Sequence, residues 1–149
     1  MRLRNALAAA GLVCTAALVQ LPTAAPASAL TTTLGQRAVS EARLHVGQPY
    51  RYGAAGPTRF DCSGFTLYVF SRLGRSLPHN AAMQYGRVRH IPNADKQIGD
   101  LIFTRRSDGS IGHVGIYAGG SDIWASVQTG DVVRRQSFAG RGYAVGRVA

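Results

Sequence analysis

The sequence has little acidic charge, two cysteines and one tryptophan. Only 7 of its 149 residues are Asp or Glu, against 17 Lys and Arg, which gives a formal net charge of +10. No segment repeats with a period of about 20 to 50 residues, and Gly and Pro are dispersed, which excludes repeat, collagen-like and disordered chains. Because the sequence also lacks a phosphate-binding loop and a metal-ligand cluster, we expect no metal and no cofactor. A single ordinary domain fits this length.

Residues 1–29 have the three parts of a secretory signal peptide. Basic residues at the start precede an apolar stretch over residues 6–19, and Ala27-Ser28-Ala29 has the small-x-small pattern of a cleavage site. The apolar stretch is short for a membrane span of about 20 residues, so we predict cleavage and no stable membrane anchor. Cleavage would leave residues 30–149 as one secreted domain, extracellular or at the cell wall, with a charge of +8 because two arginines are removed.

Cleavage would also leave Cys62 as the only thiol, because Cys14 lies in the signal. An intramolecular disulfide is then excluded. A single cysteine in an exported domain is an intermolecular link, a buried inert residue or a reactive thiol.

Hydrophobic periodicity predicts helices in the first part of the domain and strands in the second. Asp61 or Ser63 can cap the second helix, which places Cys62 at its first turn. Helices followed by an antiparallel meander predict an α+β fold with the helices packed on a sheet. The predicted helices span residues 34–47, 62–73 and 81–85, and the predicted strands span residues 97–104, 113–118, 122–127, 132–136 and 143–148.

A cysteine at a helix start is a candidate nucleophile, because the helix N-terminus stabilises a thiolate. Asp61 opposes this effect, so a cationic partner is needed, and a histidine can accept the thiol proton. Of the four histidines, His45 ends the first helix, and His79 and His90 lie in polar segments predicted to be exposed. His113 instead opens a predicted strand. Its alternative interpretation is a structural or surface histidine.

Five short blocks of the sequence follow one another along the predicted domain. They are Tyr50-Arg51-Tyr52-Gly53, Phe60-Asp61-Cys62-Ser63-Gly64-Phe65, Leu77-Pro78, Gly99-Asp100-Leu101-Ile102-Phe103 and His113-Val114-Gly115-Ile116-Tyr117. Their order and spacing resemble those of NlpC-type cell-wall cysteine peptidases, and the resemblance runs from about residue 34 to residue 148, essentially the whole predicted domain. The resemblance implies a papain-like fold, with N-terminal helices packed on a mostly antiparallel sheet of five to six strands.

The resemblance also implies an activity, the hydrolysis of peptidoglycan stem peptides, commonly at the bond from D-glutamate to diaminopimelate or lysine. Cys62 matches the nucleophile and His113 the general base, and Tyr50 is an oxyanion candidate. Asp100 matches a position that we interpret as structural. The candidates for substrate contact are Asp61, Ser63, Tyr52 and Trp124, although sheet packing is an alternative role for Trp124.

The chain departs from the family at the third polar residue, which orients the base about a dozen positions after it. Counting from His113 reaches Ala125, whose side chain cannot accept a hydrogen bond. Three explanations stay open. Ser126, Gln128 or a backbone carbonyl orients His113; a loop shift brings Asp122 or Asp131 there; or the protein is a weakened or inactive enzyme.

The arginine excess predicts binding to anionic polymers. Export argues against nucleic acid and favours the anionic polymers of a cell wall, while scattered solvated arginines are the alternative. The leading hypothesis is a secreted, monomeric peptidoglycan endopeptidase. The others are a catalytically weak wall-binding module and an amidase or acyltransferase on the same scaffold.

Overall fold

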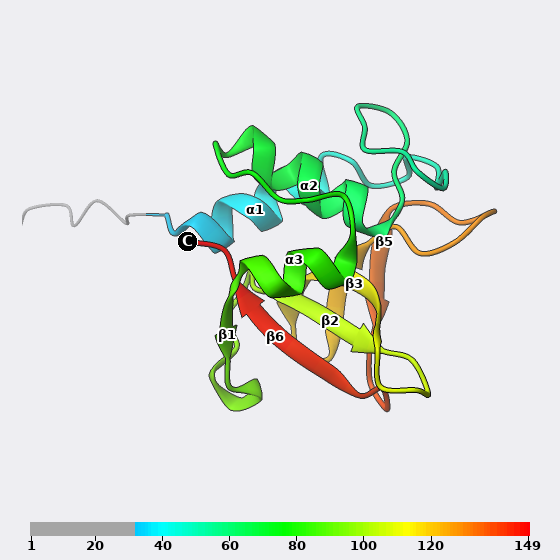
Figure 1. The fold of residues 1–149 in the computed structure, drawn as a ribbon. Coiled ribbons are helices and arrows are strands. Elements are labelled where there is room, and N and C mark those ends of the chain that lie inside the picture. Colours follow the sequence, from blue (N-terminus) through cyan, green and yellow to red (C-terminus); the bar gives the residue numbers. More distant parts are fainter. Residues whose placement is uncertain (1–31) are drawn as a thin grey trace, which may run out of the picture. The chain divides into compact units, whose positions relative to one another are not determined.

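The computed structural model describes residues 32–149, so the predicted signal peptide at residues 1–29 lies outside the described residues. Three helices come first and most of the sheet follows, as predicted (Figure 1). The helices are α1 (Leu34–Arg43), α2 (Cys62–Arg72) and α3 (Ala81–Arg87), and a short 3-10 helix, η1, spans Asn93–Asp95. The strands are β1 (Arg89–Ile91), β2 (Leu101–Arg105), β3 (Ile111–Gly119), β4 (Asp122–Ala125), β5 (Arg134–Ser137) and β6 (Tyr143–Arg147).

Each of the three α-helices begins at a side-chain cap. Thr33 forms a capping box with Gln36 at the start of α1. Asp61 caps α2 and Asn80 caps α3, each by accepting a hydrogen bond from a backbone N–H in the first turn. Helix α2 is closed by Gly74 at φ 74°, in the left-handed conformation that favours glycine. Local chemistry therefore sets the boundaries of the helices.

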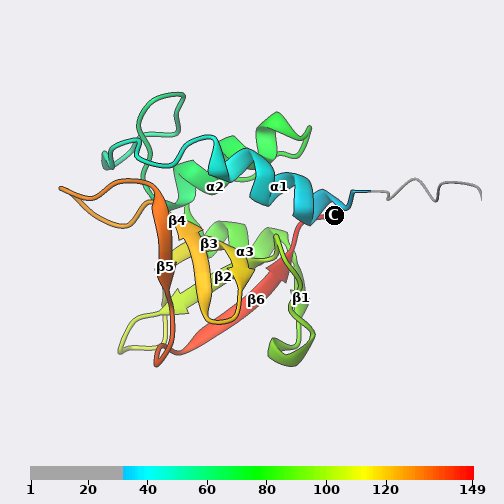
Figure 2. The same ribbon diagram turned by 180° about the vertical axis from the view of Figure 1, so that it is seen from behind.

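The helices pack on one face of the sheet, which the two opposite views show (Figures 1 and 2). The larger core contains apolar side chains of α1 and α2, such as Phe65 and Val69, together with Phe103 and Val114 from the sheet. Because side chains alternate along a strand, the opposite face carries a separate cluster. That cluster contains Ile102, Tyr117, Ile123, Ala125, Phe138 and Val145.

A buried glutamine joins α2 to α3. The side chain of Gln84 is fully buried, accepts a hydrogen bond from the Thr66 hydroxyl at 2.7 Å and donates to the carbonyls of Ser63 and Pro78. This satisfied polar network holds α3 against the first turn of α2.

The sheet has six strands in the order β1-β6-β2-β3-β4-β5, and every neighbouring pair is antiparallel. The prediction of a simple meander is correct for β2 to β5 and wrong for β6, which returns to lie between β1 and β2. An ion pair stabilises this return, because Arg147 on β6 donates to both carboxylate oxygens of Asp100 at 2.7 and 2.8 Å. Asp100 therefore has the structural role predicted for it. Strand β1 was not predicted; it is three residues long.

Across residues 32–149, no helix combines the length and the apolar character that a membrane crossing requires.

Candidate active site

Asp61 anchors the start of helix α2, where Cys62 is the first residue. Its Oδ1 accepts a hydrogen bond from the Gly64 backbone at 2.7 Å, and its Oδ2 accepts one from the Gly53 backbone at 2.9 Å. Gly64 packs directly on the preceding loop, since a Cβ there would lie 2.0 Å from the carbonyl oxygen of Ala54. The position of Cys62 is therefore set by the helix and by the loop before it.

The sulfur of Cys62 lies against strand β3. The backbones of Val114, on β3, and of Ser63 lie close enough to the sulfur to lower the pKa of the thiol. His113 immediately precedes Val114, and its side chain lines the same cleft as Cys62. The structure thus brings together the two residues that the sequence indicates as nucleophile and base.

The cleft around these residues has a volume of about 690 Å³. It is bounded by the loop before α2, the starts of α2 and α3, the β2–β3 turn and the segment before β6. The lining residues are Tyr50, Tyr52, Gly53, Asp61, Cys62, Ser63, His79, Asn80, Ala81, Ala82, Arg106, Ser110, Ile111, Gly112, His113, Val127 and Arg141.

The electrostatics of the site favour a neutral thiol beside a neutral imidazole. Burial raises the pKa of Cys62, the charge of Asp61 raises it further, and hydrogen bonds from the backbone only partly offset both. The backbone at the helix start lowers the pKa and Asp61 opposes it, as expected from the sequence, but burial outweighs the contribution of the backbone. Burial lowers the pKa of His113 to about 4, and the charge of Arg141 contributes to that shift.

Two tyrosines border the cleft. Tyr50 is partly buried, and burial followed by the nearby Cys62 and Asp61 raises the pKa of its phenol, which therefore stays protonated as a hydrogen-bond donor. Tyr52 lies at the rim with 87% of its surface exposed. Both are thus available to a molecule in the cleft.

Asp61 and Ser63 line the cleft but are mostly engaged with the protein. The hydroxyl of Ser63 donates to Oδ1 of Asp61 at 3.4 Å, and Nε2 of His79 donates to the same oxygen at 2.8 Å. This contact of His79 with Asp61 was not predicted from the sequence, in which His79 stands in a polar segment. The signal for it was its position directly after the Leu77-Pro78 block. The contact depends on the path of the chain between α2 and α3.

Comparisons with known proteins match this arrangement. The sequence profile of the NlpC/P60 family covers residues 47–146. The chain belongs to the NlpC/P60 family. It is 50% identical over 84 residues to a probable endopeptidase p60 of Listeria grayi, covering 56% of this chain and 16% of that protein. It is 36% identical over 104 residues to a probable endopeptidase of Corynebacterium glutamicum, covering 70% of this chain and 48% of that protein.

Among solved structures, the NlpC/p60 domain of the peptidoglycan hydrolase SagA has a TM-score of 0.69 and 32% identity, covering 77% of this chain and 100% of that domain. This similarity confirms the predicted α+β fold of the NlpC/P60 type. The chain spans less than half the length of the two curated relatives.

The NlpC/P60 third position is apolar in this structure. Trp124 pairs with Ile116 across β3 and β4, so strand alternation puts Ala125 on the face of the sheet that carries His113. Ala125 is fully buried. Nε2 of His113 is also buried and has no hydrogen-bond partner within residues 32–149. Counting from His113 thus leads to a buried alanine on the same face of the sheet, and no side chain within residues 32–149 accepts a hydrogen bond from Nε2 of His113.

The proposed substitutes for the third residue contact other groups. Ser126 is buried and donates its hydroxyl to the carbonyl of Phe60 at 2.9 Å. Asp131 accepts two hydrogen bonds from Nε and one from NH2 of Arg134, and Asp122 pairs with Arg135 at 2.9 Å. Gln128 is exposed. None of these four reaches Nε2 of His113.

Trp124 is partly buried against the helix-side core and does not line the cleft. The fold therefore supports sheet packing, and not substrate contact, as the role of Trp124. Two cleft residues not predicted from the sequence are Arg106, after β2, and Arg141, before β6. No group of three or more His, Cys, Asp or Glu residues in the described part of the chain is arranged to hold a metal ion.

Proposed function

We propose that this NlpC/P60 chain is a peptidoglycan endopeptidase that hydrolyses stem peptides with Cys62 as nucleophile and His113 as general base. The observation that carries the proposal is the cleft that Cys62 and His113 both line, in which the residue next to His113 lies close to the sulfur. The names of the relatives, probable endopeptidases and a peptidoglycan hydrolase, support the substrate class.

In the proposed reaction, the sulfur of Cys62 attacks the carbonyl carbon while the imidazole of His113 takes the thiol proton. Collapse of the tetrahedral intermediate expels the amine, which receives that proton from His113, and leaves a thioester. Water then hydrolyses the thioester, with His113 accepting a proton from the water and returning it to the sulfur. The Cys62 backbone N–H and the Tyr50 hydroxyl are the proposed donors to the oxyanion.

The bond that we propose for cleavage joins D-glutamate to diaminopimelate or lysine. Digestion of purified peptidoglycan, followed by mass spectrometry of the released fragments, tests this assignment. Wild-type protein is expected to release fragments ending in D-glutamate, and Cys62→Ala is expected to release none. Equal release by both proteins contradicts the proposal, and cleavage between sugar and peptide points instead to the amidase alternative.

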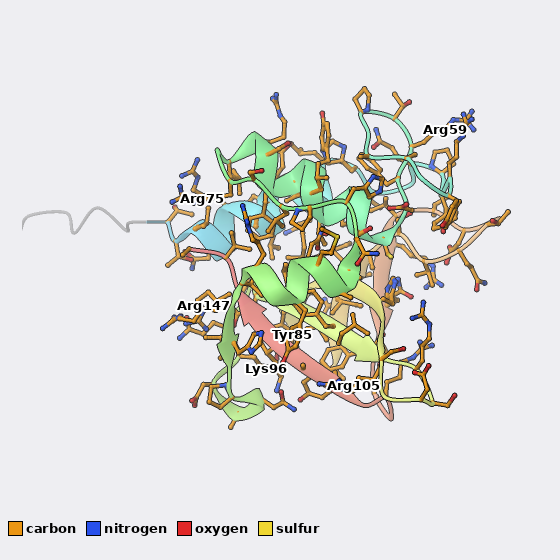
Figure 3. All side chains as sticks on the ribbon, viewed as in Figure 1. Arg59, Arg75, Tyr85, Lys96, Arg105 and Arg147 are labelled. Carbon is orange, nitrogen blue, oxygen red and sulfur yellow. The ribbon has the colours of Figure 1, made fainter. Side chains whose placement is uncertain are left out.

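A second candidate function is a catalytically weak module that binds the wall. The unpartnered nitrogen of His113 favours it, because an imidazole without an orienting acceptor is a poorer base. The net charge of +10 also favours it, although Arg59, Arg75 and Arg105 extend from widely separated segments (Figure 3), as expected for scattered solvated arginines. This candidate predicts sedimentation with isolated walls that falls steeply with salt and no turnover dependent on Cys62.

Secretion to the wall is part of the same proposal. It rests on the signal-like residues 1–29 and is tested by locating the protein in culture fractions.

A further inference from the structure

Two arginines face the cleft without a carboxylate partner. Arg106 and Arg141 both line the cleft, and neither forms an ion pair within residues 32–149. The one carboxylate in the lining, Asp61, is 8% exposed and already accepts from Gly53, Gly64 and His79. Hydrogen bonds from Ser110 lower the pKa of Asp108 and the nearby charge of Arg106 lowers it further, but Asp108 does not line the cleft and forms no ion pair with Arg106 within residues 32–149. Two positive charges in the cleft are therefore left without an ion-pair partner.

Arg106 is held in place beside His113. Its NH1 donates to the carbonyl of Ile111 at 3.0 Å and contacts the Ser110 hydroxyl at 3.4 Å. Its side chain packs over Gly112, where a Cβ would lie 2.7 Å from Cγ of Arg106. Glycine at this position thus lets the guanidinium lie close to the strand. An arginine held this way keeps further N–H donors for an anion.

Arg141 also lies near His113 but belongs to another segment of the chain. It lies between β5 and β6, and its charge is felt at His113, where it adds to the lowering of the pKa by burial. Arg106 packs over Gly112, the residue before His113, and the charge of Arg141 reaches His113, so both arginines lie on the strand side of the cleft, whereas Asp61 lies at its helix side.

We infer that Arg106 and Arg141 form a subsite for a carboxylate on the amine side of the scissile bond, which makes the protein selective for diaminopimelate over lysine stem peptides. The inference rests on the proposed function. The residue that protonates the leaving amine is His113, so groups beside it face the amine-side residue of the substrate. Diaminopimelate carries a side-chain carboxylate at that residue, and lysine carries an ammonium group, which two arginines would repel.

Three soluble stem peptides test the inference: one with diaminopimelate, one with diaminopimelate amidated at its side-chain carboxylate, and one with lysine. Wild type is expected to favour the free carboxylate by about tenfold or more in kcat/KM, with most of the change in KM. Arg141→Gln and Arg106→Gln should each reduce this preference about tenfold, and Arg141→Lys should retain part of it. Arg37→Gln on α1 removes the same charge outside the cleft and should leave the preference unchanged.

Peptides with D-isoglutamine in place of D-isoglutamate separate the two carboxylates that flank the bond. If the arginine variants respond to this change and not to amidation of diaminopimelate, the assignment to the amine side is wrong. Equal kcat/KM for all three peptides with wild type also overturns it.

Binding of the same peptides to Cys62→Ala by calorimetry separates the subsite from the activity. Tighter binding of the diaminopimelate peptide, lost in Cys62→Ala combined with Arg141→Gln, supports the subsite even if wild type cleaves nothing. Equal affinity for the three peptides contradicts the subsite even if wild type is an active endopeptidase.

Discussion

The two sides of the cleft differ in how their buried polar groups are satisfied. Hydrogen-bond donors surround the carboxylate of Asp61 on the helix side, whereas the ring of His113 on the strand side has a nitrogen with no acceptor within residues 32–149. On the helix side, Asp61 accepts hydrogen bonds from Gly53, Gly64 and His79. On the strand side, Nε2 of His113 is buried and unpartnered within residues 32–149.

The difference shows that the two members of the proposed pair are held by different forces. Hydrogen bonds and a helix cap position Cys62, and they are directional. The orientation of the His113 ring depends on packing within a strand, which restrains rotation less strictly than a hydrogen bond to the ring would. We therefore expect the position of Cys62 to be firmly held, and the orientation of the His113 ring to be one that an added hydrogen bond would improve.

The largest expected effect is a loss of stability in acid that originates at His113. Its pKa is lowered to about 4 in the folded protein, from about 6.5. Between these values the unfolded chain binds more protons than the folded one, so stability falls as pH decreases. From pH 7 to pH 4 this group contributes a loss of about 3 kcal/mol. Urea unfolding of wild type and His113→Gln at both pH values measures it.

The difference between the two proteins isolates His113 from other titrating groups. The variant should lose about 3 kcal/mol less than wild type over this range. An identical pH dependence in both would show that His113 is not held in its neutral form by burial.

A smaller effect is expected from Asp61. Replacement by Ala removes the cap of α2 and leaves the N–H groups of Gly53 and Gly64 without their acceptor, which should cost about 2 kcal/mol in urea unfolding. Asp61→Asn keeps an oxygen acceptor and should cost less. Because the charge of Asp61 raises the pKa of Cys62, both variants should alkylate with iodoacetamide at a lower pH than wild type. Unchanged alkylation profiles would contradict the electrostatic role of Asp61.

The smallest effect is expected from substitutions of Ala125, which test whether His113 needs an orienting group. Asn at this position would place an acceptor on the face that carries His113, and a single added hydrogen bond is worth about 1 kcal/mol. We expect Ala125→Asn to raise kcat/KM on a soluble stem peptide about fivefold. Ala125→Leu, of similar size and without an acceptor, controls for the added volume. An equal response of both variants would mean that the base needs no orienting group.

Much of the helix side could be predicted from the sequence, because its determinants are local. Asp61 stands next to Cys62, and the cap, the helix and Gly74 follow within a dozen residues. His113 and Ala125 could also be placed, since the period of two along β3 and β4 conserves the face on which each side chain lies.

Other features depend on distant pairing and could not be predicted from the sequence. The return of β6 beside β2 depends on backbone pairing with β1 and β2 and is accompanied by the contact between Arg147 and Asp100, which lie far apart in the sequence. The same return carries Arg141 to the cleft, and the chain between α2 and α3 carries His79 to Asp61. No local pattern in the sequence encodes these approaches.

Hydrolysis of one defined stem peptide containing diaminopimelate, followed by mass spectrometry, tests most directly whether Cys62 and His113 catalyse the cleavage. Wild type is compared with Cys62→Ala and His113→Ala, after urea unfolding has shown that all three proteins are folded. Wild type is expected to give two products, one ending in D-glutamate and one beginning with diaminopimelate. Neither variant is expected to give any product. The same products from folded Cys62→Ala at the wild-type rate would contradict it.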